Sequence, residues 1–72
     1  MRFFEGFYGG MFLKACIIYC SESSAWELDI ISVTDFGKKY PYFSETYQTE
    51  KEAVSAMHKR CGYNWREVGR LE

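Results

Sequence analysis

The chain has 72 residues, an apolar share of 47%, and nine basic against ten acidic side chains. This length predicts one small domain over residues 1–72 with a modest core, because so short a chain buries only ~60% of its extended surface, and the composition excludes a disordered tail. A net charge of −1 supplies no global field that would hold nucleic acid or an anionic membrane.

The first ten residues allow two interpretations. Residues 3–8 form an aromatic run, and Gly9-Gly10 separates this run from the apolar segment that begins at Met11. Two glycines between apolar runs favour a tight hairpin turn, because both central positions of that turn need a positive φ. The alternative is that residues 1–10 form a flexible arm and that the folded part begins at Met11.

Two long strands are expected next. Met11–Cys20 is largely apolar on both faces that a period of two defines, which predicts a central strand covered on both sides. Residues 25–34 alternate between apolar and polar positions, with Trp26, Leu28 and Ile30 on one face. This alternation predicts a half-buried antiparallel strand.

A third strand is predicted over residues 42–48, after a turn at residues 35–39. Pro41 lacks an amide hydrogen and therefore belongs at the start of an edge strand. Within this strand Phe43 and Tyr47 share one face.

Residues 50–61 carry a complete helix signature. Thr49 and Glu52 have the capping-box spacing, and Gly62 supplies the residue of positive φ with which helices often end. Apolar residues recur between them at three- and four-residue spacing, and a helix this short must pack its apolar stripe against a partner. The stripe consists of Ala53, Val54, Met57 and Cys61.

Residues 65–71 form a weaker predicted strand. It could lie parallel to the third strand, because the helix supplies a long enough crossover, or it could join the sheet elsewhere. The sequence therefore predicts an α+β fold, in which an antiparallel sheet of three to five strands in the order ββ(β)αβ carries helix 50–61 on one face.

The cysteine count indicates the compartment. Three cysteines, an odd number, argue against a disulfide framework and favour a reducing environment, so we expect a cytoplasmic protein. Glu5, Lys14 and the two glycines interrupt the apolar start of the chain, and no run approaches the ~18 apolar residues of a membrane span. We expect neither export nor membrane insertion.

The chain offers few groups for catalysis. His58 is the only histidine, and its place at the margin of the apolar stripe favours a boundary residue that packs its ring. No serine or cysteine lies in a nucleophile-elbow context, and no glycine-rich phosphate loop precedes the helix. We therefore predict no enzymatic activity and no cofactor.

A metal site is not expected either. Cys16 and Cys20 lie four residues apart on one predicted strand, a separation of roughly 13 Å. Zinc ligands lie within ~2.3 Å of one ion, so these two thiols cannot share it. We expect them to be buried free thiols.

One segment resembles a known DNA-binding architecture. A strand that enters a capped helix after two earlier strands has the pattern Tyr47-x-Thr49-x-x-Glu52-Ala53. This pattern resembles the small three-stranded domains at the N-termini of phage-type integrases, and the resemblance implies a DNA-binding module that sets its sheet in the major groove. Acidic residues on the strands make nucleic acid the less favoured partner, because such a domain presents lysine and arginine to phosphates.

The remaining interpretation is a module that binds another protein. One short helix covers one face of the sheet, so aromatic side chains on the other face and an edge strand near Pro41 would be available for contact. We predict a stoichiometric inhibitor of a larger protein, of the kind that phages and mobile elements encode, or a homodimer that pairs through the sheet edge. The expected interaction surface consists of Tyr8, Phe12, Lys38, Lys39, Tyr40, Tyr42, Trp65 and Arg66.

Overall fold

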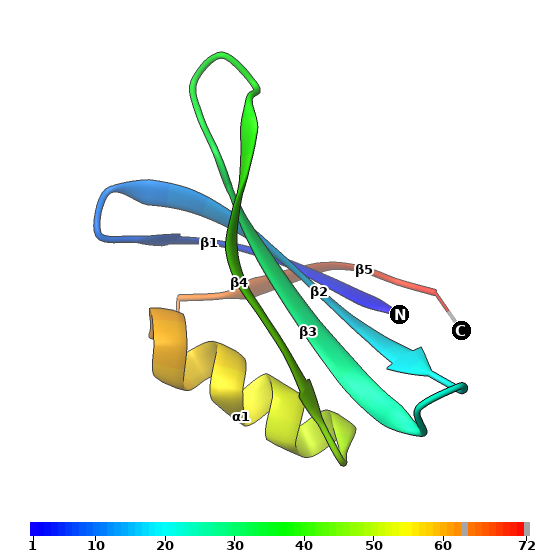
Figure 1. Cartoon of the computed structure of the whole chain (residues 1–72). Coiled ribbons are helices and arrows are strands. Elements are labelled where there is room, and N and C mark those ends of the chain that lie inside the picture. The colour runs from blue at the N-terminus through cyan, green and yellow to red at the C-terminus, as the bar shows by residue number, and fades with distance from the viewer. Residues whose placement is uncertain (63, 72) are drawn as a thin grey trace.

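The computed structural model describes residues 1–62 and 64–71, with Cys61 described by its backbone alone. In this part of the chain, five strands form one antiparallel sheet, and one helix packs against it (Figure 1). The α+β fold predicted from the sequence is therefore confirmed. The elements are β1 (Arg2–Tyr8), β2 (Met11–Cys20), β3 (Ala25–Val33), β4 (Lys39–Tyr47), α1 (Glu50–Cys61) and β5 (Arg66–Arg70).

The first ten residues form a hairpin strand and its turn. β1 pairs with β2 from Arg2 opposite Ile17 to Tyr8 opposite Met11. The glycines at positions 9 and 10 have φ values of 58° and 81°. A two-residue turn of this kind matches the right-handed twist of the flanking strands, and residues with side chains rarely adopt it.

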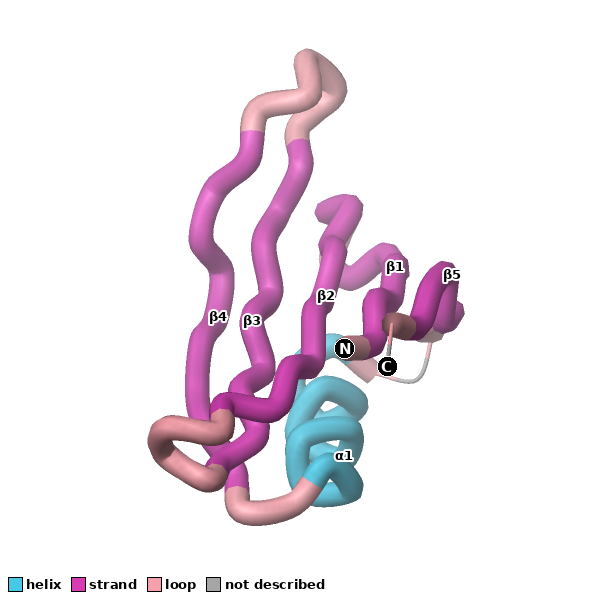
Figure 2. Tube along the Cα trace, turned by 90° about the vertical axis from the view of Figure 1, so that its right-hand side faces the viewer, coloured by secondary structure: helices cyan, strands magenta, loops and turns pink. Residues whose placement is uncertain are grey.

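The strand order is β4-β3-β2-β1-β5, which the tube view follows from one side of the sheet to the other (Figure 2). β2 lies in the middle of the sheet as predicted, and β4 lies at an edge, as Pro41 predicts. The expectation that β2 is covered on both sides is wrong, because α1 buries only the face of Leu13, Ala15 and Ile17, and Phe12, Cys16 and Ile18 on the other face stay half-buried. β5 pairs antiparallel with β1 at the opposite edge. The sequence allowed the last strand either to lie parallel to the third predicted strand or to join the sheet elsewhere. The structure excludes the parallel arrangement.

The core lies between α1 and the centre of the sheet. Thr49 caps the helix by accepting a hydrogen bond from the Glu52 amide at 3.1 Å, and Gly62 ends it with a φ of 74°. The predicted apolar stripe of the helix supplies Ala53 and Met57 to the core, whereas the side chain of Cys61 lies outside the described residues. The buried side chains are Phe4, Leu13, Ala15, Ile17, Leu28, Ile30, Ala53 and Met57.

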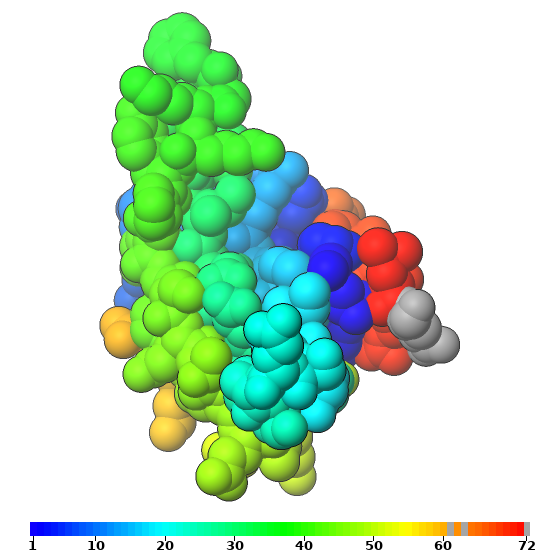
Figure 3. All heavy atoms as spheres, turned by 45° about the vertical axis from the view of Figure 1, so that its right-hand side comes forward, coloured from blue at the N-terminus to red at the C-terminus, as the bar shows by residue number. Residues whose placement is uncertain are grey.

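The helix is too short to cover the strands along their whole length. α1 has 12 residues and measures about 18 Å, whereas β2 has 10 residues and measures about 33 Å. The β3–β4 hairpin consequently projects beyond the part of the sheet that α1 covers, and it forms a narrow arm in the space-filling view (Figure 3). No helix in the described ranges is both long and apolar enough to cross a membrane.

Trp65 closes one end of the core against Gly6. The indole Nε1 donates a hydrogen bond to the Met57 carbonyl oxygen at 3.2 Å. A Cβ atom added at Gly6 would lie 3.2 Å from the Trp65 ring and 3.1 Å from the Asn64 carbonyl oxygen. The missing side chain on β1 therefore makes room for the tryptophan.

We expect Gly6→Ala to lower the free energy of unfolding by about 1–3 kcal/mol, because the ring and the adjacent backbone must shift to admit the methyl group. For a domain of this size, each kcal/mol lowers the melting temperature by ~4–8 °C. Thermal and urea denaturation measure the change. Gly69→Ala is the matched control, since its added Cβ would approach Phe3 no closer than 3.5 Å. Equal destabilisation by both variants would contradict this account of Gly6.

Candidate protein-binding surface

A row of four side chains crosses the sheet on the face opposite α1. Phe7 pairs with Phe12, Phe12 pairs with Val33, and Val33 pairs with Lys39. Paired residues of an antiparallel sheet lie on the same face. Leu13, the residue after Phe12, is fully buried on the face that packs against α1. Because successive side chains of a strand point to opposite faces, these four side chains lie on the face away from α1. We call these four residues the hairpin row, and the face that carries them the open face.

Phe7 is the most exposed apolar member of the hairpin row. Its side chain is 66% exposed, although its ring centroid lies 5.0 Å from that of Phe12 with the planes tilted by 43°. This ring contact orients Phe7 without covering it. Exposed aromatic surface of this kind is enriched at the centre of protein interfaces, whereas Lys39, two strands away from Phe12 on β4, is a polar residue of the kind that lies at their rim.

Phe12 and Lys39 were expected at the interaction surface, and both belong to the hairpin row. Tyr8, Lys38 and Tyr40 lie near the same end of the sheet, but they belong to its helix side. Tyr8 is four residues from the buried Phe4 on the same strand, and the Lys38 Nζ lies 5.6 Å from the Tyr40 ring centroid. The predicted surface is therefore divided between the two sides of the sheet.

The other three expected residues lie apart from the hairpin row. Arg66 Nη2 approaches one carboxylate oxygen of Glu5 at 3.8 Å, and Lys14 Nζ approaches the other at 3.7 Å, so these residues form a charged cluster on the open face. Tyr42 is the extra residue of a bulge in β4. Trp65 packs on the core, which corrects the expectation that it faces outward.

The open face carries both signs of charge in balance. Its charged residues alternate along the strands with side chains that are buried on the helix side. The cations are Lys14, Lys39 and Arg66, and the anions are Glu5, Glu27 and Asp29. This face therefore lacks the excess of positive charge that a phosphate backbone attracts.

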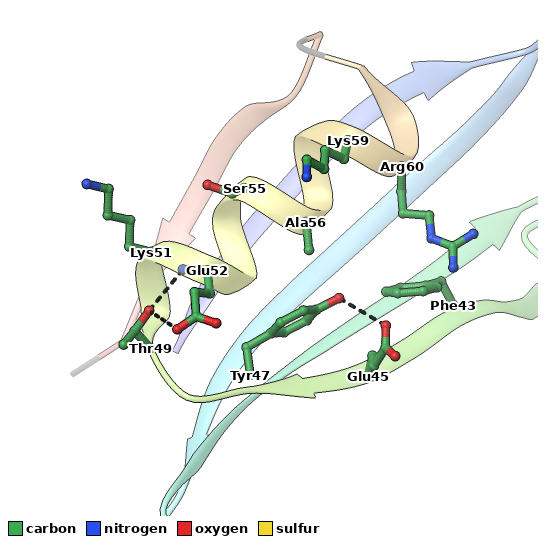
Figure 4. Close-up of a pocket in the computed structure, with 10 residues that line it drawn as sticks. All are labelled: Phe43, Glu45, Tyr47, Thr49, Lys51, Glu52, Ser55, Ala56, Lys59 and Arg60. Atoms are coloured by element: carbon green, nitrogen blue, oxygen red, sulfur yellow. Dashed lines mark hydrogen bonds between the residues drawn. The ribbon is translucent and has the colours of Figure 1, made fainter.

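Sequence reasoning missed a groove between β4 and α1. Its β4 wall consists of Phe43, Glu45 and Tyr47, which point toward the helix (Figure 4). The groove has a volume of about 660 Å³. The sequence signal for this groove is the pair of small residues Ser55 and Ala56 on the side of the helix that faces the edge strand. The helix wall consists of Thr49, Lys51, Glu52, Ser55, Ala56, Lys59 and Arg60.

Cys16 and Cys20 are free thiols as expected, but they are half-buried on the open face rather than buried, because no strand or helix among the described residues covers that face. Burial raises the pKa of Cys16 above its ordinary value, and the charge of Asp29 adds to this effect. Desolvation also raises the pKa of Cys20, whose Sγ donates a hydrogen bond to Glu27 Oε2 at 3.5 Å. Both thiols therefore stay protonated at neutral pH, where they are weak nucleophiles.

His58 and the carboxylates do not build a metal site. His58 Nδ1 lies 3.2 Å from the Gly62 carbonyl oxygen at the end of α1. Among the residues that the structure describes, no group of three or more histidine, cysteine, aspartate or glutamate side chains could hold a metal ion.

No protein-family model, curated protein or solved structure matches this chain. The function must therefore be inferred from the chemistry of the surfaces themselves. Those surfaces are the hairpin row, the charged cluster beside it, and the groove at the β4 edge.

We expect Glu27→Gln to increase the reactivity of Cys20 toward iodoacetamide near pH 8. A raised pKa lowers the thiolate fraction at any pH below it, so removing the neighbouring negative charge should shift the rate profile of Cys20 to lower pH. Mass spectrometry of the labelled peptides measures each thiol separately. Cys16 is the internal control, because Glu27 is the smallest of the causes that act on its pKa, whereas Cys20 donates a hydrogen bond to Glu27 directly. An unchanged profile for Cys20, or an equal shift for Cys16, would contradict the assigned cause.

Proposed function

We propose that this chain is a small, non-enzymatic module that binds another protein by stoichiometric contact, and that inhibition of a larger protein is the form this takes. The hairpin row supports the proposal most directly, because a 66% exposed Phe7 is held against Phe12 on an open sheet face. Covering apolar surface yields roughly 25 cal/mol per Å², and aromatic residues supply a large share of interface energy.

The hairpin row is suited to binding because its backbone is already ordered. The two-glycine turn fixes the end of the β1–β2 hairpin, and β3 continues the sheet beside Phe12. A partner would therefore order few new groups on contact, which lowers the entropic cost of association. Lys39 at the end of the row would provide a polar contact at the rim.

A DNA-binding module that uses its sheet is the alternative. The balanced charge of the open face disfavours it, because duplex binding draws its affinity from neutralised phosphates. Glu5 also engages both Lys14 and Arg66, so neither cation is fully available to a phosphate. For the compartment we propose the cytoplasm, in keeping with the free thiols of Cys16 and Cys20.

We expect Phe7→Ser to weaken binding of the native partner at least ~10-fold, because an aromatic side chain at the centre of an interface supplies a large share of its energy. Val68→Ser is the matched control, since Val68 is 47% exposed on β5 and does not belong to the hairpin row. Chemical crosslinking and affinity capture from the native host, followed by mass spectrometry, identify the partner. Titration calorimetry then compares the two variants.

A salt titration with generic duplex DNA tests the alternative in parallel. The proposal expects no appreciable duplex affinity at low salt. A strong duplex affinity that falls steeply as salt rises would overturn it in favour of DNA binding. Equal capture of the partner by wild type and Phe7→Ser would remove the hairpin row from the interface.

A further inference from the structure

The second half of β4 is an open sheet edge. Among the described residues, β4 pairs with β3 alone. The backbone N–H and C=O groups on its other side therefore form no hydrogen bonds to a neighbouring strand. Pro41 and the bulge at Tyr42 disrupt the first half of this edge. Residues 43–47 follow without a proline or a bulge, and they are the ones that border the groove.

The groove lies where the side chains of an added strand would point. Successive side chains of a strand alternate between the two faces of its sheet, so every second residue of a strand paired with β4 would face the helix side. Phe43 and Tyr47, both half-buried, supply apolar surface on the β4 wall. Ala56 lies across from them on α1, and its small side chain leaves the space that an incoming side chain would fill (Figure 4).

The acidic side chains of the groove accept hydrogen bonds from neighbouring hydroxyl groups. Glu45 Oε2 accepts a hydrogen bond from the Tyr47 hydroxyl at 3.1 Å, and Glu52 Oε1 accepts one from the Thr49 hydroxyl at the same distance. Both acidic groups therefore already have donors.

The cations of the groove have no such partners. Arg60 lies over the Phe43 ring, with the guanidinium carbon 4.2 Å from the ring centroid. Within residues 1–62 and 64–71, neither Lys59 nor Arg60 forms an ion pair. The Phe43 end of the groove thus presents positive charge next to apolar surface, with no carboxylate of the described residues at ion-pair distance.

We propose that an extended, acidic peptide segment of a partner protein adds to β4 as a further antiparallel strand. An apolar side chain of this segment enters the groove beside Tyr47 and Ala56. The apolar side chain lies opposite Glu45, so that two positions later in the antiparallel peptide an acidic side chain lies opposite Phe43 and faces Lys59 and Arg60. The inference rests on the proposed protein-binding function, but it uses a surface separate from the hairpin row.

Synthetic peptides test this inference directly. The probe is a peptide of alternating threonine and valine with an acetylated N-terminus and an amidated C-terminus. A leucine replaces one valine, and a glutamate replaces the following valine, two residues later. We expect it to bind the whole chain in a fluorescence anisotropy titration and to shift the backbone amide signals of residues 43–47 in an NMR spectrum. A peptide with lysine in place of the glutamate should bind more weakly.

Variants of the helix wall provide the matched controls. Ala56→Phe should fill the groove and abolish binding, whereas Ala56→Ser should leave binding unchanged, and thermal melting checks that both variants fold. Arg60→Glu should weaken the glutamate peptide about five-fold, as expected for an exposed charge pair, and should strengthen the lysine peptide. Phe7→Ser should bind both peptides as wild type does.

Three results would overturn the inference: no shift at residues 43–47, equal binding by Ala56→Phe and Ala56→Ser, or no change of peptide preference in Arg60→Glu. A concentration-dependent dimer in sedimentation that Ala56→Phe abolishes would assign the edge to a second copy of this chain instead. If Ala56→Phe retains the native partner and Phe7→Ser loses it, the groove proposal fails while the protein-binding function stands.

Discussion

The structure depends on the contact between α1 and the centre of the sheet. A helix of about 18 Å can bury only part of strands that reach about 33 Å, so the fully buried residues cluster beneath it. The hairpin end that the helix does not reach exposes Tyr40 on the helix side, whereas Phe7 is exposed on the opposite face of the sheet. Both candidate surfaces follow from the single helix layer of the described residues, because α1 covers only one face of the sheet and the groove forms where the flank of α1 meets the β4 edge.

Arg2 ties the far edge of the sheet to the same helix. Its Nη1 lies 2.8 Å from Glu50 at the first turn of α1, and its Nε lies 2.8 Å from Glu67 on β5. The hydrogen bond from Arg2 holds the pKa of Glu67 below its usual value. This ion pair therefore stabilises the fold above the ordinary pKa of a glutamate, and its contribution is lost as the pH falls through the lowered pKa. β5, with its weak sequence pattern, is held by this charge contact as well as by its pairing with β1.

The elements that the sequence predicts correctly are those with local causes. The capping pair Thr49 and Glu52, the two-glycine turn and the two apolar faces of β2 each act within a few residues, so spacing alone reveals them. The position of Trp65 depends on the missing side chain of Gly6, far away in the chain, and no local pattern encodes that contact. Phe12 was identifiable as a candidate, but its neighbour Val33 emerges only from the strand register.

The two edges of the sheet differ in a way that bears on function. β5 is short, carries a bulge at Val68 and contains the charged residues Arg66, Glu67 and Arg70, all of which discourage pairing with another strand. β4 concentrates its proline and its bulge in its first half and leaves residues 43–47 regular beside an apolar groove. A domain with so modest a core gains no stability from leaving that stretch open. The proposed strand addition therefore falls at the edge that lacks these protections.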